Sequence, residues 1–295
     1  MSALDLEALR QAGRVAAAVR RVAALRSIAG SAVLETCEAV EREIVRLGAF
    51  PAFPVQCSID AIAAHSCPAP GSAALLRAGS LVKWDIGVHV DGNVVDTAVS
   101  VCVGRNGLKE RLIETAQAAL AAALTVVAPG VAVRQIARQV ETTVRSRGFA
   151  PLRHLCGHGL ARWQVHGPPA IPSIVADATD DALAAGSIVA IETFVTDGSC
   201  EVVEQGEAEV FRLTLAPGAD QDGLLDALHA FHGLPFARRQ LTAFPPDAVR
   251  QTLRSLSQRG ALAAYRPLVQ AEWRPVAQAE HTVLLHANGS EVLTL

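Results

Sequence analysis

Residues 79–88 read GSLVKWDIGV, and residues 186–195 read GSIVAIETFV. The two stretches share glycine, serine and valine positions, and Asp85 of the first falls on Glu192 of the second. Each runs on into an Asp-Gly pair, at 91–92 and 197–198, which predicts a turn. An ionised carboxylate inside an apolar strand is costly without a partner. The repeat therefore predicts that the two carboxylates face each other across a shared cation.

A longer repeat, offset by 100 residues, precedes each of these strands. IAGSAVLETCEAVEREIVRLGAFP at 28–51 matches APGVAVRQIARQVETTVRSRGFAP at 128–151, and Glu41 recurs as Glu141. Each copy predicts a long helix, a glycine stop, an amphipathic helix and a second glycine stop. The two apolar stripes are Val33, Cys37, Val40 and Ile44, and Val133, Ile136, Val140 and Val144. We expect two similar halves packed about a pseudo-twofold axis, with a cleft where their strands meet.

Residues 82–90 and 95–103 alternate between two faces, as strands do. The Asp-Gly pair between them is a strong signal for a two-residue hairpin. Such a hairpin pairs Asp85 with Ala98 and makes Asp96 a diagonal neighbour of Asp85 on the same face. Diagonal neighbours lie roughly 7–8 Å apart. Two carboxylates at that distance can converge on one pair of metal ions.

Six short segments carry candidate chemistry, and each alone is typical of an ordinary core or capping residue. They are AAHS (His65), KWDIG (Asp85), VVDTAV (Asp96), CGHGLARWQVHG (His158 and His166), AIETF (Glu192) and AEHTVLL (Glu280). Asp96 and Glu280 each introduce a valine-rich strand, so we expect each half to supply two carboxylates and a histidine to join them. Together the segments predict one site.

The charge of this set favours metal. Four carboxylates carry −4, which two divalent cations balance. Without metal, four like charges in one cleft cannot all stay ionised, and their pKa values rise. Four oxygen-donor side chains and one imidazole suit manganese, iron or cobalt better than a thiolate zinc site does, and zinc stays an alternative.

The composition excludes several other classes. The chain has 295 residues, of which 51% are hydrophobic, and a net charge of −3, so it offers no argument for nucleic acid or an anionic membrane. Its six cysteines form no CxxC pair and are expected to be reduced core residues. Five arginines interrupt residues 10–26, so no signal-peptide core or membrane span is expected. We expect a soluble cytoplasmic protein.

These segments resemble methionine aminopeptidase, more closely type II, and the match runs nearly end to end. The sharpest stretches are PAFPVQCSIDAIAAH (51–65), WDIGVHVDGNVVDTAVSV (84–101), GHGLARWQVHG (157–167), IETF (191–194), LPFARR (234–239) and EHT (280–282). The resemblance implies an α+β pita-bread (creatinase/aminopeptidase) fold. In that fold two pseudo-twofold-related halves share a curved antiparallel sheet covered by helices. A single catalytic domain, 1–295, is expected.

Residues 206–270 resemble the insertion that separates type II enzymes from type I. ADQDGLLDALHAFHG (219–233) and PPDAVRQTLRSLSQRG (245–260) predict helices, and GALAAYRPLV (260–269) a short wing or strand. The pattern is winged-helix-like, but it has no basic stripe of the kind that DNA recognition needs. We therefore interpret it as an inserted helical subdomain of the enzyme.

The resemblance also implies a role for each site residue. The ligands of a dinuclear centre with a bridging water or hydroxide are Asp85, Asp96, His158, Glu192 and Glu280. Glu192 also serves as general base, His65 bonds the scissile amide, and His166 polarises the scissile carbonyl. Walls around the first side chain are expected at Phe53, Val165 and Tyr265. The cofactors expected are two ions of cobalt, manganese, iron or zinc.

Four departures from the family pattern remove no ligand and bear on the shape of the substrate groove. Gln56 replaces an asparagine, Ser66 and Cys67 stand where an aromatic residue usually follows the histidine, and Ala279 replaces an aromatic residue. The sequence at 167–169 is Gly-Pro-Pro in place of small residues. Cys67 is expected to be an inert buried thiol, because reactivity requires an exposed thiolate.

The expected activity is removal of the initiator methionine from nascent polypeptides, including those at the ribosome, when the second residue is small. A monomer that binds neither nucleic acid nor membrane is expected. One alternative is an Xaa-Pro peptidase or creatinase-like enzyme, which usually carries a sizeable extra N-terminal domain. Another is a non-catalytic homologue that binds peptide, RNA or ribosomes, although such relatives typically lose ligands that this chain keeps.

Overall fold

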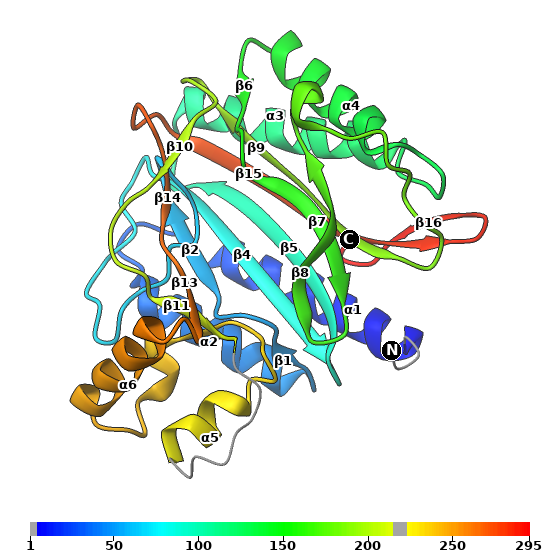
Figure 1. Ribbon diagram of the computed structural model, residues 1–295. Coiled ribbons are helices and arrows are strands. Elements are labelled where there is room, and N and C mark those ends of the chain that lie inside the picture. Colours follow the sequence, from blue (N-terminus) through cyan, green and yellow to red (C-terminus); the bar gives the residue numbers. More distant parts are fainter. Residues whose placement is uncertain (1–4, 215–222) are drawn as a thin grey trace.

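The computed structural model describes residues 5–214 and 223–295 and centres on one curved antiparallel sheet (Figure 1). Its strands run in the order β1-β4-β5-β15-β9-β7-β8, with β2 beside β4, β6 beside β9 and β16 beside β15. The bounds are β1 Phe50–Pro51, β2 Gln56–Ile59, β4 Leu81–Val90, β5 Asn93–Cys102, β6 Ala150–Pro151, β7 Cys156–Ala161, β8 Gln164–Pro172, β9 Ile188–Thr196, β15 Val276–His286 and β16 Gly289–Val292. The predicted α+β architecture is confirmed.

Two pairs of helices cover one face of this sheet, one pair for each half (Figure 1). Helix α1 (Leu6–Leu25) packs on β4 and β5 beside α2 (Val33–Arg46), and α3 (Gly107–Leu124) packs on β9 and β15 beside α4 (Val133–Ser146). Both predicted apolar stripes are buried in the two cores that result. The 3.6-residue periodicity of the repeat therefore located these interfaces correctly.

The repeat also explains one recurring polar residue. A Glu41 carboxylate oxygen accepts the Val55 backbone N–H at 2.9 Å, and the equivalent Glu141 accepts the Val175 N–H at 2.8 Å. Each glutamate thus satisfies a backbone donor outside its own helix, just before β2 for Glu41 and at the start of the short helix Val175–Asp177 for Glu141. Short strands β1 and β6, which follow the two helices, join β4 and β9 in the same way.

The predicted hairpin is confirmed, with Asp85 opposite Ala98 and Asp96 opposite Gly87. The expectation that Glu280 and Asp96 introduce their strands was wrong. β15 begins at Val276 and keeps Glu280 at its centre, and Asp96 likewise lies inside β5 rather than at its start. Unlike the first Asp-Gly pair, Asp197–Gly198 does not join two paired strands, because the next strand joins a different sheet and β9 pairs with β15 from the end of the chain.

The segment between β9 and β15 contributes strands to two small sheets and has a separate apolar core. One sheet contains β10 (Val202–Glu204), β14 (Leu268–Gln270) and β3 (Ile62–Ala64). The other contains β11 (Val210–Leu213), β12 (Phe236–Ala237) and β13 (Leu262–Tyr265), beside α5 (Gly223–His229) and α6 (Pro246–Gln258). Two short 3₁₀ helices are η1 (Val175–Asp177) and η2 (Arg238–Leu241). The helix predicted at 245–260 is confirmed, whereas part of the one predicted at 219–233 lies outside the described residues.

Arg239 of η2 joins this segment to the first half of the molecule. Its guanidinium is buried and forms an ion pair with Glu41 of α2, which also holds Val55. A buried charge that lost this partner would be left uncompensated. The pair therefore fixes the position of η2 and of the strand β12 that precedes it.

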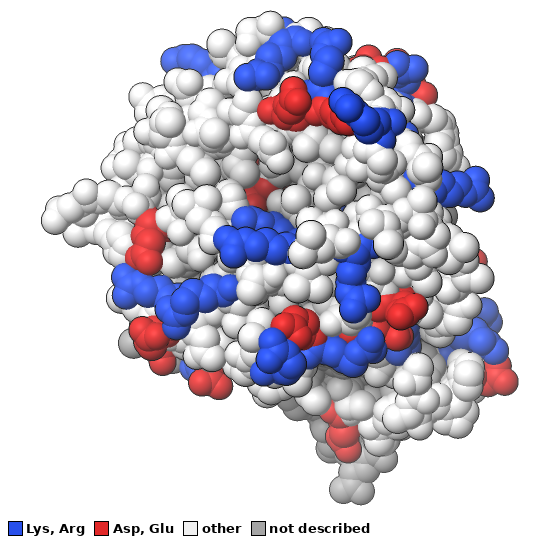
Figure 2. Space-filling model, turned by 180° about the vertical axis from the view of Figure 1, so that it is seen from behind, with Lys and Arg blue, Asp and Glu red and all other residues white. Residues whose placement is uncertain are grey.

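On the face seen from behind, basic and acidic side chains lie in neighbouring groups rather than in one field of a single sign (Figure 2). Within the described ranges, no helix is both long and apolar enough to cross a bilayer. All six cysteines are free, but Cys102, Cys156 and Cys200 are partly exposed, so the expectation of core positions holds for the other three only.

Candidate active site

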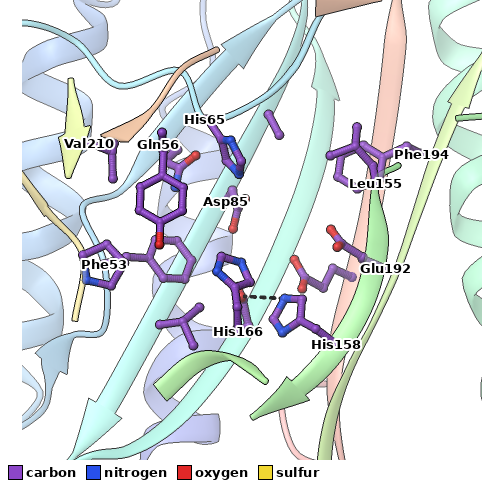
Figure 3. Close-up of a pocket in the computed structure, with 16 residues that line it drawn as sticks. Phe53, Gln56, His65, Asp85, Leu155, His158, His166, Glu192, Phe194 and Val210 are labelled. Carbon is purple, nitrogen blue, oxygen red and sulfur yellow. Dashed lines mark ion pairs between the residues drawn. The ribbon is translucent and has the colours of Figure 1, made fainter. Parts of the chain in front are cut away.

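One cavity on the uncovered face of the sheet collects all ten residues singled out from the sequence (Figure 3). Both halves contribute strands, and the segment between β9 and β15 supplies part of the wall. The ten are Phe53, His65, Asp85, Asp96, His158, Val165, His166, Glu192, Tyr265 and Glu280. In Figure 3 the labelled Asp85, His158 and Glu192 side chains point toward one another from strands on opposite sides of the cavity. The fold therefore brings together every predicted position.

Strand register places the four carboxylates at the seam between the halves. Glu280 of β15 lies opposite Glu192 of β9 on one side and opposite Ala98 of β5 on the other. Ala98 is in turn opposite Asp85, and Asp96 lies two residues along the same strand. Residues two apart on a strand, and residues directly opposite, share one face. All four acids consequently face the cavity.

Hydroxyl side chains close the seam between β5 and β15. Thr97 Oγ1 donates to the Glu280 carbonyl at 2.9 Å, and Ser100 Oγ donates to the Gln278 carbonyl at 2.7 Å. Thr282 Oγ1 donates to the Asp96 carbonyl and accepts the Asp96 N–H, both at 2.7 Å. These bonds satisfy backbone groups beside two of the acids and hold both acids in place.

The buried part of this cluster has the donor set of a metal site. Ligand atoms of Asp96, His158 and Glu280 all lie within 4.8 Å of one another, and Asp96 Oδ2 is 3.8 Å from His158 Nε2. Buried oxygens Asp85 Oδ1, Asp96 Oδ1 and Glu280 Oε1 find no hydrogen-bond donor among the described residues. A buried acceptor without a donor is costly. Divalent cations in the cavity would satisfy these oxygens, so the residues fit a metal centre.

Electrostatics supports the same conclusion. Burial, with repulsion from the neighbouring acids, raises the pKa of Asp96, Glu192 and Glu280 well above its ordinary value. Burial raises the pKa of Asp85 to about 6 and lowers the pKa of His158 to about 4. The rise in the acids is the one expected from crowding without metal. A neutral imidazole is the form that binds a cation, and a cation restores the ionised carboxylates.

Four rings, including that of the candidate ligand His158, form a wall beside the acids. The ring centroids of His158 and His166 are 4.6 Å apart, those of His166 and Tyr265 6.2 Å, and those of His65 and Tyr265 5.5 Å. His65 has a φ of 63°, a left-handed conformation at the end of β3 that is rare outside glycine. Burial lowers its pKa, so the neutral ring is favoured. Two imidazoles thus line the cavity near the candidate ligands.

Comparison with known proteins decides the family. A sequence model of metallopeptidase family M24 matches residues 7–227. The chain belongs to metallopeptidase family M24. A methionine aminopeptidase of Thermococcus kodakarensis is 37% identical over 98% of this chain and 99% of its own length. The resemblance to methionine aminopeptidases is thereby confirmed, and the protein is a hydrolase of the M24 metallopeptidases.

Solved structures confirm the pita-bread fold of this M24 member. The crystal structure of methionine aminopeptidase from Thermotoga maritima has a TM-score of 0.73 at 21% identity, covering 99% of this chain and 98% of that one. Prolidase from Pyrococcus furiosus has a TM-score of 0.62 at 18% identity, covering 98% of this chain but 63% of its own. At these identities the likeness concerns the fold alone.

Sequence reasoning missed two residues that support the candidate site and several that line its cavity. Gln278 Nε2 donates to Glu192 Oε2 at 3.4 Å, and Lys83, which is fully buried, donates to the carbonyls of Asp60 and Val276 at 3.0 and 2.8 Å. Both stand two residues before a candidate ligand on the same strand face, a signal that could have identified them. Further cavity walls come from Ala64, Leu155, Phe194, Val210 and Pro235.

Three of the four departures have unequal consequences. Gln56 is buried, lies opposite Asp85 and lines the cavity. Ala279 faces away into the core behind the sheet, because its neighbour Glu280 faces the cavity; an effect on the groove was therefore wrongly expected there. Cys67 is buried against Val210 of the neighbouring segment, and burial raises its pKa to about 11, which supports an inert thiol.

Proposed function

We propose that this M24 metallopeptidase removes the N-terminal methionine from polypeptides whose second residue is small, with two divalent metal ions in its site. One observation carries the proposal. Four carboxylates and one imidazole converge in a cavity whose other walls are largely apolar and aromatic. The methionine aminopeptidase from Thermococcus kodakarensis, alike over its full length, supports the same activity.

The residues that would hold the ions are the five predicted ligands. When bound, divalent ions would supply Lewis acidity and a water molecule that loses its proton near neutral pH. Four carboxylates balance two such ions, and the oxygen-rich donor set favours manganese, iron or cobalt, with zinc as the further candidate. Asp85 and Glu192 are half-buried at the cavity surface, whereas Asp96, His158 and Glu280 lie beneath.

Glu192 is positioned to act as the general base. Gln278 donates to its Oε2 atom, and Glu192 lines the cavity, where the carboxylate can accept a proton and deliver it to the leaving amine. His166 lies beside His158 and can donate to the scissile carbonyl oxygen as negative charge develops there. His65, across the cavity at the ring of Tyr265, can hold the scissile amide.

The walls of the cavity suit an unbranched apolar side chain. Phe53 and Val165 are buried, and Tyr265 places its ring beside both candidate histidines. Leu155 and Phe194 continue the apolar surface on the opposite side (Figure 3). A methionine side chain, flexible and polarizable, fills such a slot well. We propose nascent polypeptide N-termini in the cytoplasm, including those emerging at the ribosome, as substrates of a monomeric enzyme.

Hydrolysis of Met-Ala-Ser tests the activity. The metal-stripped protein is assayed alone and after addition of cobalt or manganese. The variant Asp96→Ala and the surface control Asp247→Ala are assayed in the same way, and the number of metal ions bound to each protein is measured. We expect turnover that requires two metal equivalents, is lost in Asp96→Ala and persists in Asp247→Ala. Thermal unfolding confirms that each variant is folded.

A parallel peptide series separates the alternatives. Preference for an Xaa-Pro peptide over Met-Ala-Ser would replace the proposal with an Xaa-Pro peptidase of the same fold. A folded wild-type protein that binds metal and cleaves neither peptide would favour the non-catalytic alternative. Retention of two metals and full turnover in Asp96→Ala would contradict the assignment of that ligand.

A further inference from the structure

A second, basic groove opens beside the proposed active site. Its walls include Val165, His166, Pro235 and Tyr265, which also line the cavity of the candidate active site, so the groove adjoins that cavity. Beyond these shared residues it is lined by Arg162 and Arg212 among others, and none of its described lining residues is acidic. The cavity of the candidate active site is therefore rich in carboxylates, whereas the neighbouring groove carries positive charge.

Arg212 is held in this groove with its charge available. It projects from β11, and its Nε donates to the Tyr265 hydroxyl at 3.2 Å. In the described ranges 5–214 and 223–295, no carboxylate lies within ion-pair distance of its guanidinium. The side chain is only partly exposed, so the groove shields it from bulk water. A guanidinium tethered through Nε keeps its two terminal nitrogens free for bidentate recognition of a carboxylate.

A short series of side-chain contacts links the candidate metal ligands to Arg212. Contacts lead from His158 to His166 at 4.6 Å between ring centroids, to Tyr265 at 6.2 Å, and through the Tyr265 hydroxyl to Arg212 at 3.2 Å. An extended peptide advances about 3.5 Å per residue. A chain whose scissile carbonyl lies at His166 can thus place its second or third following residue beside the guanidinium.

We propose that this groove holds the peptide segment that follows the scissile bond, and that Arg212 binds a carboxylate there. The inference rests on the proposed function. The carboxylate has two possible sources, the free C-terminus of a tripeptide or an acidic side chain at the third residue of a longer chain. In either case Arg212 raises the specificity for acidic substrates without touching the reacting atoms.

Two matched peptide pairs test the proposal with the metal-loaded enzyme. Met-Ala-Ser as free acid and as amide reports on the C-terminus; Met-Ala-Asp-Gly-amide and Met-Ala-Asn-Gly-amide report on the side chain. A partly exposed ion pair predicts that kcat/KM favours the acid by about 3- to 5-fold in at least one pair, chiefly through KM. Higher ionic strength should reduce that preference.

Arg212→Gln should abolish the preference and Arg212→Lys should restore part of it. Arg254→Gln, an exposed arginine of α6, should leave it unchanged. Loss of the bond to Tyr265 would slow acid and amide peptides equally, so the ratio distinguishes recognition from a structural effect. Equal kcat/KM for acid and amide in both wild-type pairs, or an unchanged ratio in Arg212→Gln, would overturn the proposal. If no peptide is cleaved, the proposed function fails, and calorimetric binding of the same pairs to wild type and Arg212→Gln decides this inference.

Discussion

Replacement of Gly87 by alanine would test how the apolar wall of the active site is built. A Cβ added at Gly87 would lie 2.3 Å from Cε1 and 2.4 Å from Cδ1 of the Phe53 ring. Ordinary carbon contacts begin near 3.5 Å, so the ring would have to retreat by about 1 Å. Phe53 is only 4% exposed, and Gly87 lies opposite Asp96, so neither the ring nor the strand moves freely. Overpacking of this kind costs about 1–3 kcal/mol.

Urea unfolding of the metal-free protein measures that cost. The control is Gly289→Ala, where the added Cβ meets open space and should change stability by less than about 0.5 kcal/mol. In a double-mutant cycle, Gly87→Ala should cost little in the Phe53→Ala background, because the truncated side chain leaves room for the added Cβ. KM for Met-Ala-Ser should rise in Gly87→Ala as the ring enters the pocket. Wild-type stability in Gly87→Ala together with zero coupling to Phe53 would refute the reasoning.

Two further predictions concern stability. Burial lowers the pKa of His89 to about 4, so between pH 6.5 and 4 the unfolded chain takes up a proton that the folded chain does not. The wild-type protein should therefore lose about 2–3 kcal/mol of stability as the pH falls through this range, and His89→Gln should remove that loss. A pH dependence of the urea midpoint that is the same in His89→Gln and wild type would contradict this. Arg239→Leu leaves Glu41 buried without its cation and should lower the free energy of unfolding by about 3–5 kcal/mol. Arg250→Leu removes an exposed ion pair and should lower it by less than about 1 kcal/mol. Equal urea midpoints for the two variants would argue against a structural role for the buried pair.

Local periodicity determined the parts of this protein that depend on near neighbours in the chain. The stripe that contains Val33 and the one that contains Val133 were both found because a helix returns to the same face every 3.6 residues. The relation of Asp85 to Asp96 followed from one Asp-Gly turn and strand alternation. The ten site residues could be selected from the sequence because the duplicated strands and the resemblance marked them.

Long-range pairing decided the rest. No local pattern shows that β15 inserts between β5 and β9 and sets Glu280 opposite Glu192, or that the second Asp-Gly pair closes no hairpin. Nor does it show that Lys83 reaches the start of β15, or that Arg212 lies beside Tyr265 in a groove. Periodicity specifies which face of an element is apolar, whereas the identity of the neighbour across that face depends on how distant segments pack. The sequence by itself thus determined the elements and the chemistry of the site, and only the tertiary structure decided which distant residues surround it.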